Sequence, residues 1–321
     1  MEYDSYNTRT IGEAFTQPLP QISRTKPQAE YRKLSQPSRS TMMVHAPLFY
    51  IEEDAHPLLR LATQALSATG DQVKDNMMIE PCSAYRLGSE GDVSMASYLY
   101  LLNPVHLIFS EILRTLDKSF TCSSQVTEDR WKARTDLKWV IIDRDGKSRN
   151  LAVLEFKNTS TIAWNDFKSA CTSGNKREMD MAADRARCGP GKGPFENEHT
   201  LLDNNAFYIA KQAKKYSQLV APHVAVFDWD SMFIFDFSPL AYSRYHMHEK
   251  PPTGIFFNKD SHGEETFRNL LLGFLLRALK DDAINEQYPI PRYLERYSGI
   301  SKNDVPNLTM RALNIGGLAG K

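Results

Sequence analysis

Helical spacing of apolar residues predicts several helices along the chain. The predicted segments are residues 56–69, 93–118, 165–171, 203–219 and 264–280. The second segment contains one or two helices, because Asn103-Pro104 interrupts it and Pro104 suits the first turn of a new helix.

Short apolar runs of strand type separate the later helices. They cover residues 134–142, 149–157, 223–227 and 232–237. Asp145-Gly146 lies between the first two runs, and this dipeptide between two such runs is a strong signal for a β-hairpin. Strands and helices in one segment predict an α/β fold with a mixed central sheet flanked by helices.

The regions outside this pattern define the expected domain organisation. Residues 1–44 are rich in Pro and polar residues and predict a disordered tail, and residues 301–321 predict a second one. Residues 45–103 form a helical N-terminal extension, and residues 104–300 form the α/β core. Within the core, residues 173–200 are charged and Gly-rich, which predicts an insertion that is mostly loop.

Composition narrows the class of protein only slightly. Lys+Arg and Asp+Glu both number 39, so a strongly basic binder of the histone type is excluded, whereas a locally basic nucleic-acid site is not. The four cysteines form no C-x-x-C pair, which predicts reduced thiols. The N-terminal region has no apolar signal segment and the longest apolar run is too short to span a bilayer. We therefore expect an intracellular protein, nuclear or cytoplasmic, that is not secreted and has no membrane partner.

The predicted hairpin carries the residues that suggest chemistry. Side chains alternate along a strand, so Glu155 and Lys157 share one face with Leu151 and Val153 behind them. If Asp145-Gly146 is a two-residue loop, the register places Asp136 directly opposite Glu155, with Cβ atoms about 5 Å apart.

Two carboxylates in such a position repel each other unless a cation neutralises them. Mg²⁺ (or Mn²⁺) binds through one or two carboxylates and leaves the rest of its shell for water and substrate phosphate. Lys157 lies one step further along the same face and could stabilise the charge that grows on a phosphate under attack. The pattern Asp136…Glu155-x-Lys157 therefore indicates metal-dependent phosphate chemistry.

The predicted helix over residues 203–219 adds a second polar group. Gln212 and Tyr216 are four residues apart and so lie on one face, with Lys215 beside them. An amide, a phenol and an ammonium together suit a phosphate oxygen or an unstacked base.

The order of these motifs resembles the PD-(D/E)XK, or restriction-endonuclease-like, nuclease superfamily. Gln-x-x-x-Tyr is similar to the motif of its RecB-type and λ-exonuclease-like branches. The sequence as a whole also resembles stand-alone nuclease-like proteins of filamentous fungi. The resemblance covers about residues 104–240 and departs from the family at Thr135, where the family has Pro.

This resemblance implies an αβββαβ core and assigns roles to the motif residues. Asp136 and Glu155 would be metal ligands, Lys157 the catalytic lysine, and Gln212 and Tyr216 substrate-binding or positioning residues. Glu111 is the candidate for the acidic ligand that many members carry on their first core helix.

Three functional hypotheses follow. The first is a Mg²⁺-dependent nuclease that hydrolyses phosphodiester bonds, with DNA as the favoured substrate and Lys215 and Tyr216 touching its backbone. The second is an inactive nuclease-like module that binds nucleic acid or protein. The third is a purely structural protein whose carboxylates never approach each other.

Overall fold

The computed structural model describes residues 7–24, 49–80, 86–128, 133–188, 200–238, 251–258 and 265–287. The strands of this part are β1 Asn7–Thr10, β2 Ser23–Arg24, β3 Tyr50–Glu52, β4 Met77–Glu80, β5 Arg86–Leu87, β6 Ser119–Glu128, β7 Ala133–Ile142, β8 Ser148–Phe156, β9 Cys171–Thr172, β10 His223–Phe227, β11 Ser231–Asp236 and β12 Thr253–Asn258. The helices are α1 Ile11–Thr16, α2 His56–Ala68, α3 Asp71–Lys74, α4 Glu90–Ser97, α5 Asn103–Thr115, α6 Trp164–Phe167, α7 Lys176–Cys188, α8 Asn204–Leu219 and α9 Phe267–Gln287. A π-helix, Tyr98–Leu102, joins α4 to α5, and a 3₁₀-helix, Lys168–Ala170, follows α6.

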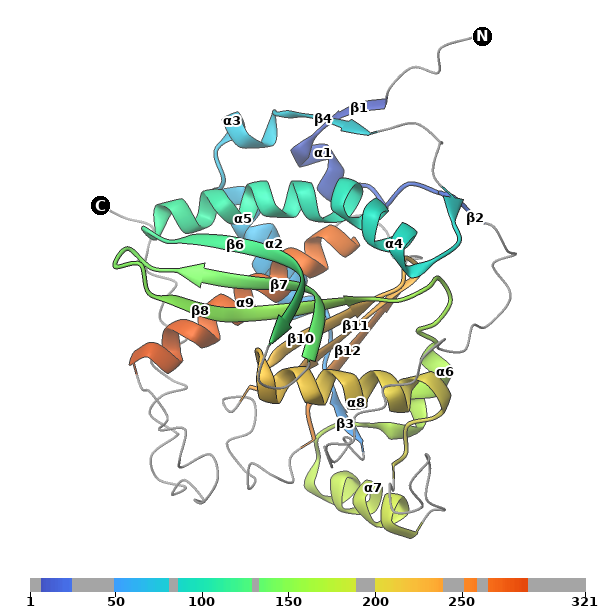
Figure 1. Cartoon of the computed structure of the whole chain (residues 1–321). Coiled ribbons are helices and arrows are strands. Elements are labelled where there is room, and N and C mark those ends of the chain that lie inside the picture. Colours follow the sequence, from blue (N-terminus) through green and yellow to red (C-terminus); the bar gives the residue numbers. More distant parts are fainter. Residues whose placement is uncertain are drawn as a thin grey trace.

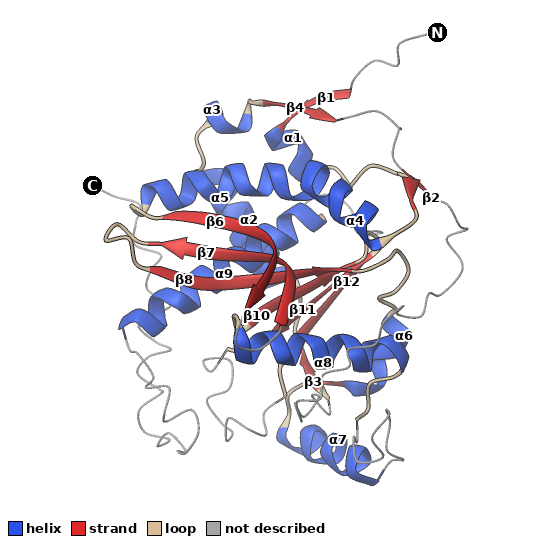
Figure 2. Cartoon of the chain, in the orientation of Figure 1, coloured by secondary structure: helices blue, strands red, loops and turns tan. Residues whose placement is uncertain are grey.

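A mixed sheet of eight strands forms the centre of the fold, in the order β6-β7-β8-β10-β11-β12-β3-β9. β6, β7 and β8 are antiparallel neighbours, whereas β8 and β10 run parallel. Figures 1 and 2 show α2, α5 and α9 on one side of this sheet and α8 on the other. The expected α/β fold with a mixed, helix-flanked sheet is therefore confirmed.

Two apolar cores lie against the two faces of the sheet. On the α5 and α9 side, residues such as Leu154 and Phe156 of β8 pack with the buried stripe of α9. On the α8 side, Val153 of β8 and Val226 of β10 pack with Ala210 and Ala213 of α8. Because both faces are covered, residues 151–156 are all buried, which explains why β8 is a nearly continuous apolar run.

The β7–β8 hairpin differs from the expected two-residue loop. Ile142 pairs with Ser148, the amide of Asp143 donates to the carbonyl of Lys147, and Gly146 has a φ of 77°. This is a three-residue loop with glycine in the left-handed position. A bulge then shifts the register between Trp139 and Val140. Loop and bulge compensate, and beyond the bulge the strands pair in the expected register.

The bulge also corrects the predicted face of Leu151. We expected Leu151 to share a face with Val153 and Glu155, but it packs in the α9-side core together with Ala152. Two consecutive residues point to one side there because the bulge interrupts the alternation. From Ala152 onward the predicted alternation holds.

A proline shapes the helix that leads into the sheet. Pro104 has no N–H, so the carbonyl of Tyr100, four residues earlier, loses its usual helical donor. The fully buried Arg268 of α9 supplies one instead, with Nε 2.6 Å from that oxygen. Arg268 also donates to the carbonyls of Ala14 and Gln17, and so it ties α1, the π-helix and α9 together.

The predicted N-terminal organisation is only partly right. The expected disordered tail over residues 1–44 is wrong for residues 7–24, where α1 buries Ile11 and Phe15 in the α9-side core. The rest of that tail lies outside the described residues. Residues 45–103 are not a separate extension, because β3 joins the central sheet and Leu58 of α2 belongs to the same core.

Other differences concern the segments with weak patterns. The insertion over residues 173–200 contains the helix α7, with Met179 and Ala182 packed against the α8-side core, while residues 189–199 lie outside the described residues. β6 and β12 were not predicted. The C-terminal helix extends to Gln287, and the predicted tail over 301–321 lies outside the described residues.

The described cysteines Cys122, Cys171 and Cys188 are free. Among the helices of the described residues, we find none long and apolar enough to cross a membrane.

The contact between α2 and α9 is close enough to test. A Cβ on Gly273 would overlap the main-chain carbonyl of Leu58. We expect Gly273→Ala to lower the free energy of unfolding by at least about 2 kcal/mol, because backbone must move. Gly91→Ala, at an exposed helical glycine with open space, should be neutral or slightly stabilising. Denaturant titration measures both, and a neutral Gly273→Ala would contradict the packing.

Candidate functional site

A buried ion pair lies where β8 ends. The amide of Lys157 donates to the carbonyl of Phe227 at 2.8 Å, which continues the parallel pairing of β8 with β10 by one residue. Glu155 and Lys157 are each 5% exposed, and Nζ of Lys157 lies 2.7 Å from Oε1 of Glu155. Two charges so well shielded from water are costly unless each is paired and hydrogen-bonded.

The helix α8 supplies the remaining partners of Glu155. Nε2 of Gln212 donates to Oε1 of Glu155 and, at 2.7 Å, to the hydroxyl of Tyr216. That hydroxyl lies 3.0 Å from Oε2 of Glu155 and 2.7 Å from the carbonyl of Arg134 on β7. The spacing of four residues places both side chains on the helix face toward the sheet. Tyr216 is buried and its hydroxyl is hydrogen-bonded on the protein side, so it holds Glu155 in place.

Asp136 lies next to this cluster on the neighbouring strand. Leu137 pairs with Leu154, so Asp136 and Glu155 are the next residues on their strands in the register predicted from the sequence. The main-chain pairing stops there, and Oδ2 of Asp136 accepts the amide of Phe156 at 2.8 Å. The two carboxylates therefore do come close together.

A third carboxylate, Glu90, approaches from α4. Its charge acts on Lys157 and on Asp136, and the charges of Lys157 and Glu155 act on it in turn. The sequence analysis missed Glu90. The available signal was the capping box of Ser89 and Asp92, in which each side chain accepts the other's backbone amide. This motif fixes the helix start at residue 90, earlier than the apolar stripe suggested.

Burial and the shared negative charge shift the pKa values of Asp136, Glu90 and Lys157. Burial, and then the neighbouring Glu155, raise the pKa of Asp136 to about 7. Burial also raises the pKa of Glu90, against the effect of Lys157. Burial lowers the pKa of Lys157, but Glu155, Glu90 and Asp136 outweigh it, so this pKa ends above its ordinary value. Lys157 is therefore a cation at neutral pH.

A cavity of about 380 Å³ opens beside Asp136. Its lining residues come from α4, the π-helix and three strands: Glu90, Gly91, Ser94, Met95, Tyr98, Ser124, Gln125, Asp136 and Phe156. Gln125 has a left-handed backbone, with a φ of 52°, at the position of β6 next to Asp136. Strained backbone of this kind is often kept where it shapes a site. A ligand in the cavity would reach both Glu90 and Asp136.

Two predicted site residues lie elsewhere. Glu111 on α5 is paired with Arg114, at 2.7 Å, and does not line the cavity. It lies beside the buried stripe of this amphipathic helix, so its side chain is partly exposed. Lys215 is partly exposed on α8, and within the described residues it has no contact with Glu155 or Asp136.

Comparison with known proteins finds no match for this chain, neither with a family model, nor with a curated protein, nor with a solved structure. The function therefore has to be inferred from the chemistry of the site itself.

The charge balance of the cluster fits a divalent cation. Asp136, Glu155 and Glu90 bring three carboxylates together, and within the described residues Lys157 is the cation among them. Carboxylate oxygens are the ligands that Mg²⁺ and Mn²⁺ prefer. Asp136 and Glu90 also face a cavity that has room for water and a further ligand.

The shifted carboxyl group predicts a measurable pH effect without metal. Asp136 ionises near pH 3.8 in the unfolded chain and near pH 7 in the folded one. Between these values the unfolded state binds fewer protons, so stability falls as the pH rises. In EDTA, Asp136→Asn should therefore stabilise the protein at pH 8, on the order of 1–3 kcal/mol, and much less at pH 4.

Thermal unfolding at the two pH values measures this difference. Glu111→Gln is the matched control, because that carboxyl group is exposed, and its effect should not change in the same direction with pH. Equal effects of Asp136→Asn at both pH values would show that burial does not raise the pKa of Asp136.

Proposed function

We propose that this protein is a divalent-metal-dependent nuclease that hydrolyses phosphodiester bonds, with DNA as the favoured substrate. The observation that carries the proposal is the meeting of Asp136, Glu155 and Lys157 at the end of β8. Gln212 and Tyr216 of α8 hydrogen-bond to Glu155 in the same place. Carboxylates, a cation and a cavity in one place are what metal-assisted phosphate hydrolysis needs.

The order of elements around the cluster supports the proposal. α5 is followed by β6, β7 and β8 and then, after the intervening α6, β9 and α7, by α8 and β10. This succession agrees with the αβββαβ order that the sequence resemblance implies. We accordingly propose a restriction-endonuclease-like core for this part of the chain, although the flanking strands β11, β12, β3 and β9 extend the sheet well beyond it.

Each residue of the cluster has a role in this proposal. Asp136 and Glu155 would hold the metal, with Glu90 in place of Glu111 as the third carboxylate. Bound Mg²⁺ supplies positive charge to a phosphate oxygen and lowers the pKa of a coordinated water. Lys157 is protonated, so its Nζ donates to the charged phosphate and does not act as the base. Gln212 and Tyr216 hold the carboxylate of Glu155 in place, and Lys215 is left as a contact for the nucleic-acid backbone.

One observation favours a second candidate, the inactive nuclease-like module. Oε1 of Glu155 already accepts from Lys157 and Gln212, and Oε2 lies beside Tyr216. In addition, no Lys or Arg of the described residues lines the cavity. A metal would compete with these donors for the oxygens of Glu155, and a module that only binds a partner would not need this exchange.

Cleavage of DNA tests the first candidate directly. We expect the protein with Mn²⁺ or Mg²⁺ to degrade DNA, and Lys157→Gln to reduce the rate about 10²–10³-fold, as for other lost transition-state donors. Circular and linear substrates distinguish endonuclease from exonuclease action. Glu90→Gln should also lower the rate, whereas Glu111→Gln, the exposed acid on α5, should leave it unchanged.

Circular dichroism of each variant checks that the fold is intact. Full activity of a folded Lys157→Gln protein would rule out this mechanism. Loss of activity in Glu111→Gln but not in Glu90→Gln would overturn the assignment of the third carboxylate.

Calorimetric titration with Mn²⁺ separates the two candidates. If the protein is a nuclease, we expect it to bind Mn²⁺. The affinity for Mn²⁺ should fall at least tenfold in Asp136→Asn, because a ligand is lost. A protein that binds DNA in EDTA, cleaves none, and shows no Mn²⁺ binding dependent on Asp136 would be the inactive module.

A further inference from the structure

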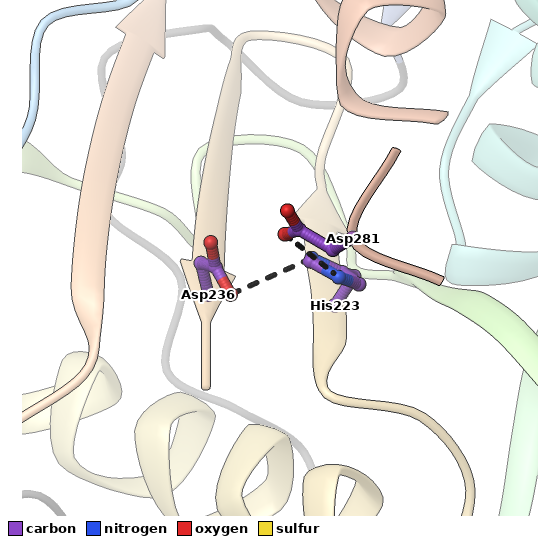
Figure 3. Close-up of side chains that lie close together, drawn as sticks. All are labelled: His223, Asp236 and Asp281. Atoms are coloured by element: carbon purple, nitrogen blue, oxygen red, sulfur yellow. Dashed lines mark ion pairs between the residues drawn. The ribbon is translucent and has the colours of Figure 1, made fainter. Parts of the chain in front are cut away.

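A second group of metal-binding side chains lies on the other face of the sheet. His223 is the first residue of β10 and pairs directly with Asp236, the last residue of β11. Asp281 approaches from the C-terminal half of α9, as Figure 3 shows. The three residues are thus brought together from two consecutive strands and from a helix much later in the chain.

Two members of the group are buried, and one ring nitrogen of the histidine has no hydrogen bond within the described residues. His223 is 2% exposed and Asp236 is 4% exposed, while Asp281 is partly exposed. Nδ1 of His223 lies 3.5 Å from Asp236, and Nε2 lies 3.5 Å from Asp281. Within the described residues Nδ1 makes no hydrogen bond. A buried ring nitrogen without one is rare and needs an explanation.

Charge at this place also favours a cation. The carboxylates of Asp236 and Asp281 face the two nitrogens of the His223 imidazole. The nearby Arg277 is paired with Glu53 through both nitrogens of its guanidinium, and its charge also acts on Asp236 and Asp281. A divalent cation would bring positive charge directly to the two carboxylates.

We propose that His223, Asp236 and Asp281 bind a divalent transition-metal ion of the zinc type. The site would fasten α9 to β10 and β11. One ligand atom from each residue lies within 4.8 Å of the other two. Zinc accepts imidazole nitrogen and carboxylate oxygen at about 2.0–2.2 Å, so its ligands must come closer than they now are. The partly exposed Asp281 side chain has to turn toward the other two when the ion binds.

The mixed ligand set argues for zinc over magnesium. Imidazole suits zinc, copper, iron and nickel, whereas magnesium prefers oxygen ligands with several waters. Three protein ligands leave a fourth position of a tetrahedral ion for water. The interior location between strands and helix fits an ion that holds the fold together.

This site is independent of the proposed nuclease cluster. Val226, the partner of Glu155 across β8 and β10, packs on the α8 side. His223 points to the other side, where its ring contacts Phe274 of α9. His223 and Val226 are three residues apart along β10, which corresponds to about 10 Å, and their side chains lie on opposite faces of the sheet. Failure of one proposal therefore leaves the other untouched.

Titration of Zn²⁺ into the full chain tests the proposal. The starting protein carries Asp136→Asn, which removes a ligand of the other proposed cation site and leaves the buried pair of Glu155 and Lys157 intact. We expect it to bind one Zn²⁺ ion, and the further change Asp281→Asn to weaken binding at least tenfold. The matched control is Asp282→Asn on the next residue of α9, whose carboxylate pairs with Arg149 instead. This control should bind Zn²⁺ like the starting protein.

Co²⁺ gives a second measurement that does not depend on a buried variant folding. Co²⁺ bound through nitrogen and oxygen in a four- or five-coordinate site absorbs visible light much more strongly than hydrated Co²⁺. We expect this absorption in the protein without substitutions and its displacement by Zn²⁺. Absence of both Zn²⁺ binding and Co²⁺ absorption would overturn the proposal, as would equal Zn²⁺ affinity in the Asp281→Asn protein.

Discussion

The site depends on how the protein tolerates charge at the end of its most buried strand. β8 is covered on both faces from Leu151 to Phe156, yet it continues directly into Lys157 with Glu155 just before. An ion pair there is stable only when every remaining donor and acceptor has a partner. The pairing of Lys157 with Phe227 and the two side chains of α8 supply these partners. The position of α8 and the length of the β8–β10 pairing thus both help to stabilise the buried ion pair of Glu155 and Lys157.

Much of this arrangement could be predicted from the sequence because it depends on short-range periodicity. Strand alternation places Glu155 and Lys157 on one face, and a spacing of four residues places Gln212 with Tyr216. The register of Asp136 was predicted correctly for a partly wrong reason. The real loop has one residue more than expected, and the bulge at Trp139 and Val140 restores the pairing. Neither the longer loop nor the bulge has a sequence signal as clear as Asp145-Gly146. The predicted register of Asp136 is right because these two irregularities cancel each other.

The missing parts are those that tertiary contacts decide. Glu90 belongs to a segment that we assigned to a separate extension, and nothing in its local pattern connects it with Asp136. Its placement follows from the continuous helix of α4 and α5, which Pro104 would break if Arg268 did not satisfy the carbonyl of Tyr100. The short strand β3 is similar, because its place in the sheet depends on β12, which has no strong pattern of its own. Pairing partners that lie hundreds of residues apart leave no trace in a local window.

The choice between an enzyme and a binding module reduces to the state of Glu155. In the metal-free protein its two oxygens are occupied by an ammonium, an amide and a phenol, and this keeps the buried charge in place. Asp136 and Glu90, by contrast, face the cavity with raised pKa values, so protonation relieves part of their repulsion. A divalent ion would replace those protons and draw Asp136 and Glu90 into the charged state. Lys157, the counter-charge that the described residues provide, would then become available to a phosphate. The same residues can thus form a stable metal-free state and a site that a cation could activate. For this reason metal binding distinguishes the enzyme from the binding module better than the fold does.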